Sequence, residues 1–238
     1  MADFTADIEG CPVSISIGNM VREKAGAYLV PHFDDNVVFG GVAGAIANNG
    51  ARRGVQEFAD FMKANGPLEF GTVWPTPSYG GNAEWLMHAV TVCSGKDTAF
   101  DVIRDATYKA LKICGEKGIG KLILPALGTG ALRELTDAQS AKAMLSGVYK
   151  YAAEGGKPVE AAFVFLNNED AQSLLDAFKG VLQTKSYKTA GTEAAAGTID
   201  FARWAVRQEE DAIANHEAER EEARRPMKPL RLKTKPQP

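Results

Sequence analysis

Cysteine is scarce in this chain of 238 residues, which contains only three. Cys11, Cys93 and Cys114 are odd in number and far apart, so they indicate no disulfide framework, and their spacing matches no zinc motif. We expect reduced thiols, as in cytoplasmic proteins, and no bound metal or cofactor.

Long apolar stretches are also missing. No run approaches the length that spans a bilayer, and residues 1–10 are acidic without an apolar core, so we expect neither membrane contact nor a signal peptide. Lys and Arg (27) nearly balance Asp and Glu (30), which gives a net charge of −3. This balance argues against a domain that binds nucleic acid through its overall charge. The sequence therefore predicts a cytoplasmic globular protein.

The common nucleotide-binding and hydrolase motifs are absent too. The chain has no GxSxG elbow, no HExxH helix and no Gly-Lys-Ser/Thr closing a phosphate loop. A dinucleotide-type GxGxxG fails after Gly128 and Gly130, because Arg133 occupies the place of the third glycine. These absences argue against elbow-type serine hydrolases, zincins, P-loop proteins and Rossmann dehydrogenases.

The chain does contain a regular alternation of strand and helix patterns. Runs of β-branched and aromatic residues bounded by turn residues predict strands, and apolar repeats at helical spacing predict helices. The expected strands are residues 13–17, 27–30, 70–74, 86–92, 121–124 and 161–166. The expected helices are residues 42–48, 55–63, 98–117, 136–151 and 170–183. Strands interleaved with helices indicate an α/β sandwich.

Two glycine-rich segments follow predicted strands. Residues 39–46 read FGGVAGAI and residues 125–132 read PALGTGAL, and a helical pattern follows each. Glycine lets phosphate oxygens approach bare backbone N–H groups, so such turns can form an anion cradle. The alternative is an ordinary strand–helix turn, which must then occur twice. Because ligands of α/β sheets bind beyond the carboxyl ends of the strands, we expect both segments to border one crevice.

The two segments, in this order of elements, resemble the macrodomain family of ADP-ribose-binding modules. Residues 39–46 resemble its first diphosphate loop, residues 125–130 its second, and residues 85–90 (WLMHAV) the strand between them; the likeness covers residues 12–183. It implies a three-layer α/β/α sandwich with a mixed central sheet. It also implies that ADP-ribose, or an ADP-ribosylated molecule, is the partner. The implied loop contacts are Gly40, Gly41, Val42, Gly128, Thr129, Gly130, Ala131 and Leu132.

The sequence departs from the family pattern twice. Where the family has Gly-Asp-Ile, with an Asp that receives the adenine amino group, this chain has Asn19 followed by Met20. An Asn oxygen can accept the same hydrogen bond, without the charge. Where family hydrolases have Asn-Ala-Ala-Asn, residues 31–36 read PHFDDN. Asp35 and Asn36 are therefore the catalytic candidates, and binding is better supported than catalysis.

The end of the last predicted strand adds ligand candidates. Leu166 offers adenine an apolar face and Asn167 a polar group, while Asn168 is expected to cap the following helix. His88 lies among apolar residues and is expected to be a core histidine, and His32 is expected in a solvated loop. Neither histidine is assigned a catalytic or metal-binding role.

The composition changes near residue 184. Residues 186–198 are rich in Ala, Gly and Thr and predict a linker. Residues 198–225 predict a charged helix or disorder, and the basic end, 226–238, can contact nucleic acid or, as we favour, serve as a solubilising terminus. We therefore expect an ADP-ribose-binding domain over residues 1–184, separable from a tail over residues 185–238.

Three functional hypotheses remain at this point. The chain binds ADP-ribose or a related ADP-ribosyl group, or it is an ADP-ribosyl hydrolase acting on a modified substrate or metabolite. In the third, it is a macrodomain-like scaffold with lost or altered ligand specificity. The departures at Asn19 and at residues 31–36 keep the second and third hypotheses open.

Overall fold

The structure of the protein is a computed structural model that describes residues 2–92, 100–130 and 135–189. The predicted ligand residues Ala131 and Leu132 lie outside the described residues, as do the predicted start of the third helix and the predicted tail from residue 190 onward. Within the described ranges, no helix has both the length and the apolar character needed to cross a membrane.

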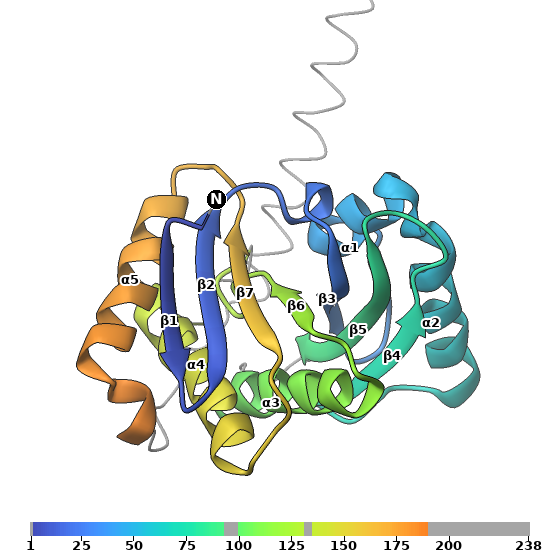
Figure 1. The fold of residues 1–238 in the computed structure, drawn as a ribbon. Coiled ribbons are helices and arrows are strands. Elements are labelled where there is room, and N and C mark those ends of the chain that lie inside the picture. Colours follow the sequence, from blue (N-terminus) through green and yellow to red (C-terminus); the bar gives the residue numbers. More distant parts are fainter. Residues whose placement is uncertain (1, 93–99, 131–134, 190–238) are drawn as a thin grey trace, which may run out of the picture. The chain divides into compact units, whose positions relative to one another are not determined.

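A mixed sheet forms the central layer (Figure 1). Its strands in the described residues are β1 (Phe4–Ile8), β2 (Cys11–Ile17), β3 (Ala25–Phe33), β4 (Val73–Pro77), β5 (Ala83–Val92), β6 (Lys121–Leu124) and β7 (Glu160–Phe165). They lie in the order β1-β2-β7-β6-β3-β5-β4. The five inner strands are parallel, whereas β1 and β4 run antiparallel at the two edges. The predicted mixed sheet is confirmed.

Both edge strands differ from the sequence prediction. β1 has no counterpart among the predicted strands, because its side chains alternate between exposed and partly buried positions and give a weak apolar signal. β4 covers Val73–Pro77 instead of residues 70–74. Pro75 and Pro77 read as turn residues in the sequence, yet an edge strand tolerates proline because one of its sides needs no N–H donors.

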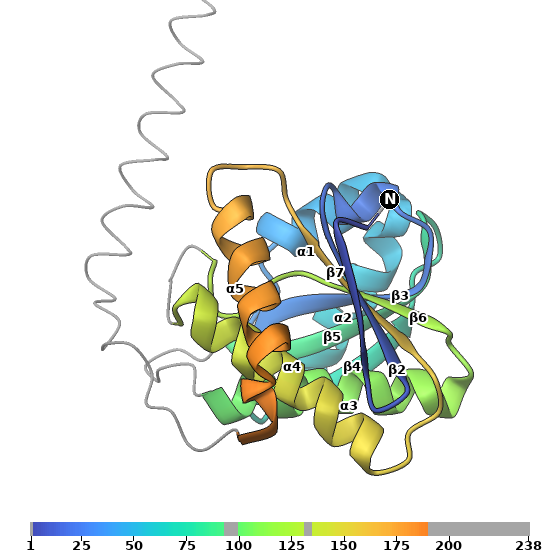
Figure 2. The same cartoon turned by 60° about the vertical axis from the view of Figure 1, so that its left-hand side comes forward.

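Helices cover both faces of this sheet (Figures 1 and 2). On one face lie α1 (Gly41–Ile46) and α2 (Arg52–Asn65), joined by the π-type turn η2 (Ala47–Ala51), and on the other lie α3 (Phe100–Lys117), α4 (Asp137–Ala153) and α5 (Ala171–Thr184). Alternate residues of β3 show the two layers. Tyr28 and Val30 pack in the cluster that includes α1, while Ala27 and Leu29 pack in the cluster that includes α3 and α4. The predicted three-layer sandwich is therefore confirmed.

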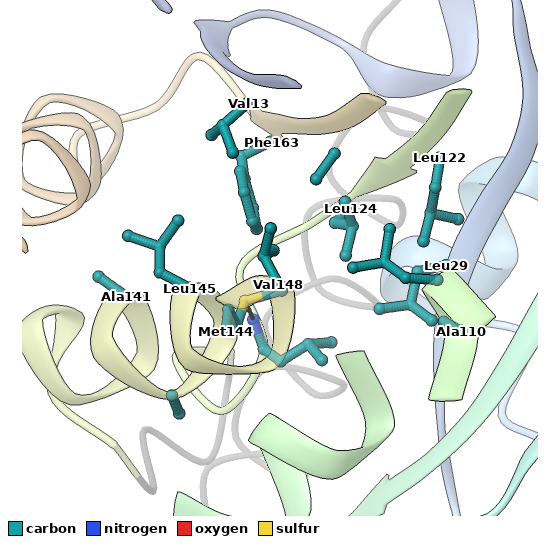
Figure 3. Packing of buried hydrophobic residues seen from close by; sticks show 14 of the residues in the cluster. Val13, Leu29, Ala110, Leu122, Leu124, Ala141, Met144, Leu145, Val148 and Phe163 are labelled. Atoms are coloured by element: carbon teal, nitrogen blue, oxygen red, sulfur yellow. Dashed lines mark hydrogen bonds between the residues drawn. The ribbon is translucent and has the colours of Figure 1, made fainter. Parts of the chain in front are cut away.

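The larger core cluster lies between the sheet and α3, α4 and α5. Figure 3 shows side chains of four strands converging on Ala110 of α3 and on α4, where the labelled residues are Ala141, Met144, Leu145 and Val148. The predicted helix start at Thr136 is confirmed, because Thr136 and Gln139 form a reciprocal capping box at the beginning of α4. This start matters for the site, because α4 follows directly after the second glycine loop.

The packed chain continues past Thr184. A short 3-10 turn, η3 (Ser186–Thr189), lies against α4, and its Tyr187 is only 4% exposed. The Ser146 hydroxyl of α4 donates a hydrogen bond to the Tyr187 carbonyl over 2.9 Å. The predicted division into residues 1–184 and 185–238 remains a prediction, and these contacts show where it is best tested.

Candidate ligand-binding site

Five neighbouring parallel strands, β2, β7, β6, β3 and β5, end at the same edge of the sheet, which we call the carboxyl edge. All described residues predicted to contact a ligand lie at this edge (Figure 1). In strand order they are residues 19–20 after β2, 166–167 after β7, 128–130 after β6 and 40–42 after β3. Parallel pairing thus brings four segments that are distant in the sequence into one row.

The two glycine loops leave neighbouring strands. Tyr28 of β3 pairs with Ile123 of β6; β6 ends one residue later at Leu124, whereas β3 continues to Phe33. The second loop therefore begins before β3 has ended. The two loops thus follow neighbouring strands at the carboxyl edge.

The first glycine loop uses its glycines for two different purposes. Gly44 is needed for packing, because a Cβ there would lie 2.6 Å from the Phe39 carbonyl oxygen. Gly41 has a φ of +50° and no atom within 4 Å of a built Cβ. Gly40, the N-cap residue of α1, is also exposed, and a Cβ built there would meet Val38 at 3.5 Å. Open space therefore lies beside the backbone at Gly41, as a bound anion requires.

The second glycine loop shows the same division. Gly128 has a φ of +77°, and its built Cβ would lie 3.0 Å from Leu135, so this glycine is required by the turn itself. Gly130 is exposed, has no unusual φ, and has nothing within 4 Å of a built Cβ. The loop is anchored at Leu127, whose N–H donates to Met144 Sδ over 3.4 Å and whose carbonyl accepts from Ser140 Oγ over 2.6 Å.

Asn19 and Met20 form a short turn at the end of β2. The Asn19 Oδ1 atom accepts a hydrogen bond from Val21 N over 3.2 Å and so caps the 3-10 turn η1 (Met20–Arg22). The Asn19 oxygen, predicted to receive an adenine amino group, is therefore already engaged with the backbone, although a carbonyl oxygen has a second lone pair. The Met20 side chain is buried in the core cluster that includes α1.

The segment after β7 exposes an apolar side chain. Leu166 is 61% exposed, and Asn167 beside it is exposed as well. Asn168 Oδ1 accepts from Asp170 N over 3.2 Å, but the N-cap residue of α5 is Asp170, so the prediction that Asn168 caps this helix is wrong. Leu166 and Asn167 are thus exposed to solvent, while Asn168 forms part of the turn before α5.

Val38 and Phe39, which have no separate role predicted from the sequence, are 52% and 38% exposed at the first glycine loop. The Arg52 guanidinium lies 5.2 Å from the centre of the Phe39 ring. Together with Leu166 they are the exposed large apolar side chains of the described carboxyl edge. No periodicity in the sequence distinguishes an exposed aromatic in a loop from a buried one.

The catalytic candidates Asp35 and Asn36 lie in the segment between β3 and the first glycine loop. Both side chains are exposed. The segment is held at its start by a hydrogen bond from Leu68 N to the Asp34 carbonyl over 2.8 Å. An exposed carboxylate and amide can orient a water molecule. Among the residues described, no cluster of three or more His, Cys, Asp or Glu could hold a metal ion.

The structure corrects one prediction for the histidines and confirms the other. His32 does not lie in a solvated loop: it belongs to β3 and is 3% exposed, because its position places it on the inner face of the sheet beneath α2. His88 of β5 is fully buried, as predicted. Residues 31–36 are largely polar, so the sequence suggested a loop, although β3 continues to Phe33 with side chains that alternate between the two faces of the sheet.

Comparison with known proteins gives the family. The Macro domain family model matches residues 36–144. A macrodomain variant from Oceanobacillus iheyensis has a TM-score of 0.67 at 17% identity, over 77% of this chain and 100% of that one. This chain belongs to the macrodomain family.

Other relatives extend the comparison of this macrodomain. A second Oceanobacillus iheyensis variant, described with ADP-ribose, has a TM-score of 0.65 at 16% identity, over 76% of this chain and 98% of that one. The Trypanosoma brucei macrodomain in complex with ADP-ribose has a TM-score of 0.59 at 18% identity, over 71% of this chain and 68% of that one. An uncharacterized protein from Pyrobaculum aerophilum is 30% identical over 141 residues, 59% of this chain and 76% of that protein.

Proposed function

We propose that this macrodomain binds ADP-ribose, or the ADP-ribosyl group of a modified molecule, in the crevice at the carboxyl edge. The observation that carries the proposal is the pair of open glycines, Gly41 and Gly130, on loops that leave neighbouring strands. Backbone N–H groups beside open space suit a diphosphate, which needs several donors at close range. Two structural relatives are described with ADP-ribose bound.

The order of the four loop segments along the carboxyl edge suggests where the other parts of ADP-ribose bind. The adenine lies toward β2 and β7, where Leu166 offers an apolar face, Asn167 a polar group, and Asn19 an oxygen with one remaining lone pair. The distal ribose lies toward the end of the second loop, near Gly130 and the predicted contacts Ala131 and Leu132. Leu166 supplies no aromatic ring, so the diphosphate carries a larger share of the affinity than stacking does.

Hydrolysis is the second candidate function. Attack on the anomeric carbon needs a water held against it by a carboxylate, an amide or a ligand phosphate. Asp35 and Asn36 are the predicted residues for this role, and both are exposed, without the packing that fixes a catalytic side chain. We therefore propose a binding protein with slow or no turnover.

We expect calorimetric titration to rank ADP-ribose above ADP and ADP above AMP, since AMP lacks both the second phosphate and the distal ribose. A mono-ADP-ribosylated substrate incubated with the protein should be bound and released slowly. Equal affinity for AMP and ADP-ribose would contradict the diphosphate assignment. Rapid release that disappears in Asp35→Ala or Asn36→Ala would instead make the protein a hydrolase.

A further inference from the structure

A row of three buried polar side chains crosses β4, β5 and β3 beneath α2. Thr76 Oγ1 lies 2.9 Å from His88 Nε2, and His88 Nδ1 lies 2.9 Å from His32 Nε2. Thr76 and His88 have no exposed surface, and His32 is 3% exposed. We call these three residues the polar row.

The polar row has a direction that one hydrogen bond fixes. The Thr76 hydroxyl donates to the Gly54 carbonyl of α2 over 3.3 Å, so its oxygen accepts a hydrogen bond from the N–H of His88 Nε2. His88 Nδ1 is then an acceptor, and His32 Nε2 donates to it. His32 Nδ1 is left as a lone pair, buried and without a hydrogen-bond partner in the part of the chain that the structure describes.

The surroundings of the polar row are apolar. The Phe58 ring of α2 stacks on His88 at 4.3 Å between centroids and lies 4.9 Å from His32. Val90 and Met62 complete the buried cluster, against which Val37 of the segment before the first glycine loop also packs. Burial among these apolar side chains removes the water that would stabilise a charge on either ring.

No described charged group compensates such a charge. Burial lowers the pKa of His32 to about 3, and burial together with His32 lowers the pKa of His88 well below its usual 6.5. No carboxylate contributes to either shift among the described residues. The charged residues of the elements packed around the row are Asp34, Asp35, Arg52, Arg53, Glu57, Asp60, Lys63, Glu69 and Glu84.

We propose that acid opens the end of β3 and the first glycine loop, because His32 Nδ1 is the point at which the polar row takes up a proton. His32 is the last residue but one of β3, and the loop with Gly40 and Gly41 begins after it. An imidazolium at His32 is stabilised by moving out toward water and the carboxylates of Asp34 and Asp35. When His32 moves, Val37 loses its packing against the buried cluster, and the first glycine loop, which follows Val37, is no longer held in place.

The direction of the pH dependence follows from linkage. In the structure described, which we call the closed form, both histidines are buried and neutral and their pKa values are lowered. Once His32 has moved out to water, its pKa returns to near the usual 6.5. The closed form is therefore fully favoured above that pH and is lost progressively as the pH falls below it. Weaker ADP-ribose binding in acid is the consequence for the site; this consequence rests on the proposed function, whereas the opening does not.

Amide hydrogen exchange without ligand tests the opening. Between pH 7 and pH 5, after correction for intrinsic rates, protection of residues 33–44 should fall about 25-fold for one histidine that titrates only when opened. Protection of β2 and β7 should change little. In His32→Gln, whose amide can still donate to His88, the fall should disappear. His216→Gln, at the third histidine of the sequence, is the matched control and should behave like the unmodified protein.

Three results would overturn the proposal: no loss of protection at residues 33–44, the same loss in His32→Gln, or an equal loss throughout the sheet. Should His32→Gln fail to fold, nitrogen NMR of the imidazole rings in the unmodified protein decides the question. His32 Nδ1 must be unprotonated at pH 7, and the first ring to gain a proton must be His32. Protonation of His32 without any change in the signals of residues 33–44 would also overturn the proposal.

Discussion

Replacing Gly130 with glutamate should reduce ADP-ribose affinity at least tenfold, which corresponds to about 1.4 kcal/mol, while leaving the fold intact. The side chain would enter the open space beside the second loop and place a negative charge where the diphosphate is proposed to lie. Gly130 has no neighbour within 4 Å of its built Cβ and no positive φ, so the backbone accepts the change. Calorimetric titration with ADP-ribose measures the loss, and circular dichroism checks the fold.

Gly120 offers the matched control for this change. It is exposed, free of neighbours within 4 Å, and lies just before β6, at the opposite end of the strand that Gly130 follows. Gly120→Glu adds the same charge and should leave affinity unchanged. Gly41 and Gly128 are poorer choices, because their φ values of +50° and +77° strain any side chain. Unchanged affinity in folded Gly130→Glu would refute the role of the second loop.

Ending the chain after Thr184 should lower the free energy of unfolding by about 2–4 kcal/mol, whereas ending it after Thr189 should not. The shorter chain loses Tyr187, which is 4% exposed, packs against Tyr149 and holds the Ser146 hydroxyl through its carbonyl. It also loses the ion pair between Lys188 and Glu9. Urea unfolding of the two truncated chains measures the difference.

The chain ending after Thr189 is the control for the loss of the tail. It should bind ADP-ribose as the full chain does, because the proposed site lies at the carboxyl edge and within residues 19–167. Equal stability of the two truncated chains would restore the predicted boundary at residue 184. A shared loss of stability would mean that residues beyond 189 contribute to the packed domain.

The interior of the fold could be predicted from the sequence because its signals are local and strong. The parallel strands are short apolar runs, and the turns after β3 and β6 are marked by glycine. The edges could not be predicted. β1 is half exposed, and β4 contains Pro75 and Pro77, which are acceptable only because the strand has a neighbour on one side alone.

The sequence predicted which segments form the candidate site, but not which of their residues are exposed. Parallel strands bring their carboxyl ends together, so the row of loops follows from topology. Which glycine is structural and which is open depends on tertiary contacts: the sequence does not show that Leu135 lies against Gly128 or that Phe39 lies against Gly44. His32 was misplaced for the same reason, since its burial comes from Phe58 on a distant helix.

The central claim is that ADP-ribose occupies the crevice at the carboxyl edge. Amide hydrogen exchange of the full chain with and without saturating ADP-ribose tests it most directly. Protection should increase at residues 40–46 and 127–130, and stay unchanged at the amino edge, where a hollow of about 500 Å³ is lined by Lys24, Gly26, Asn82, Glu84 and Lys121 among others. Protection confined to the amino-edge hollow, or no change anywhere, would contradict the account.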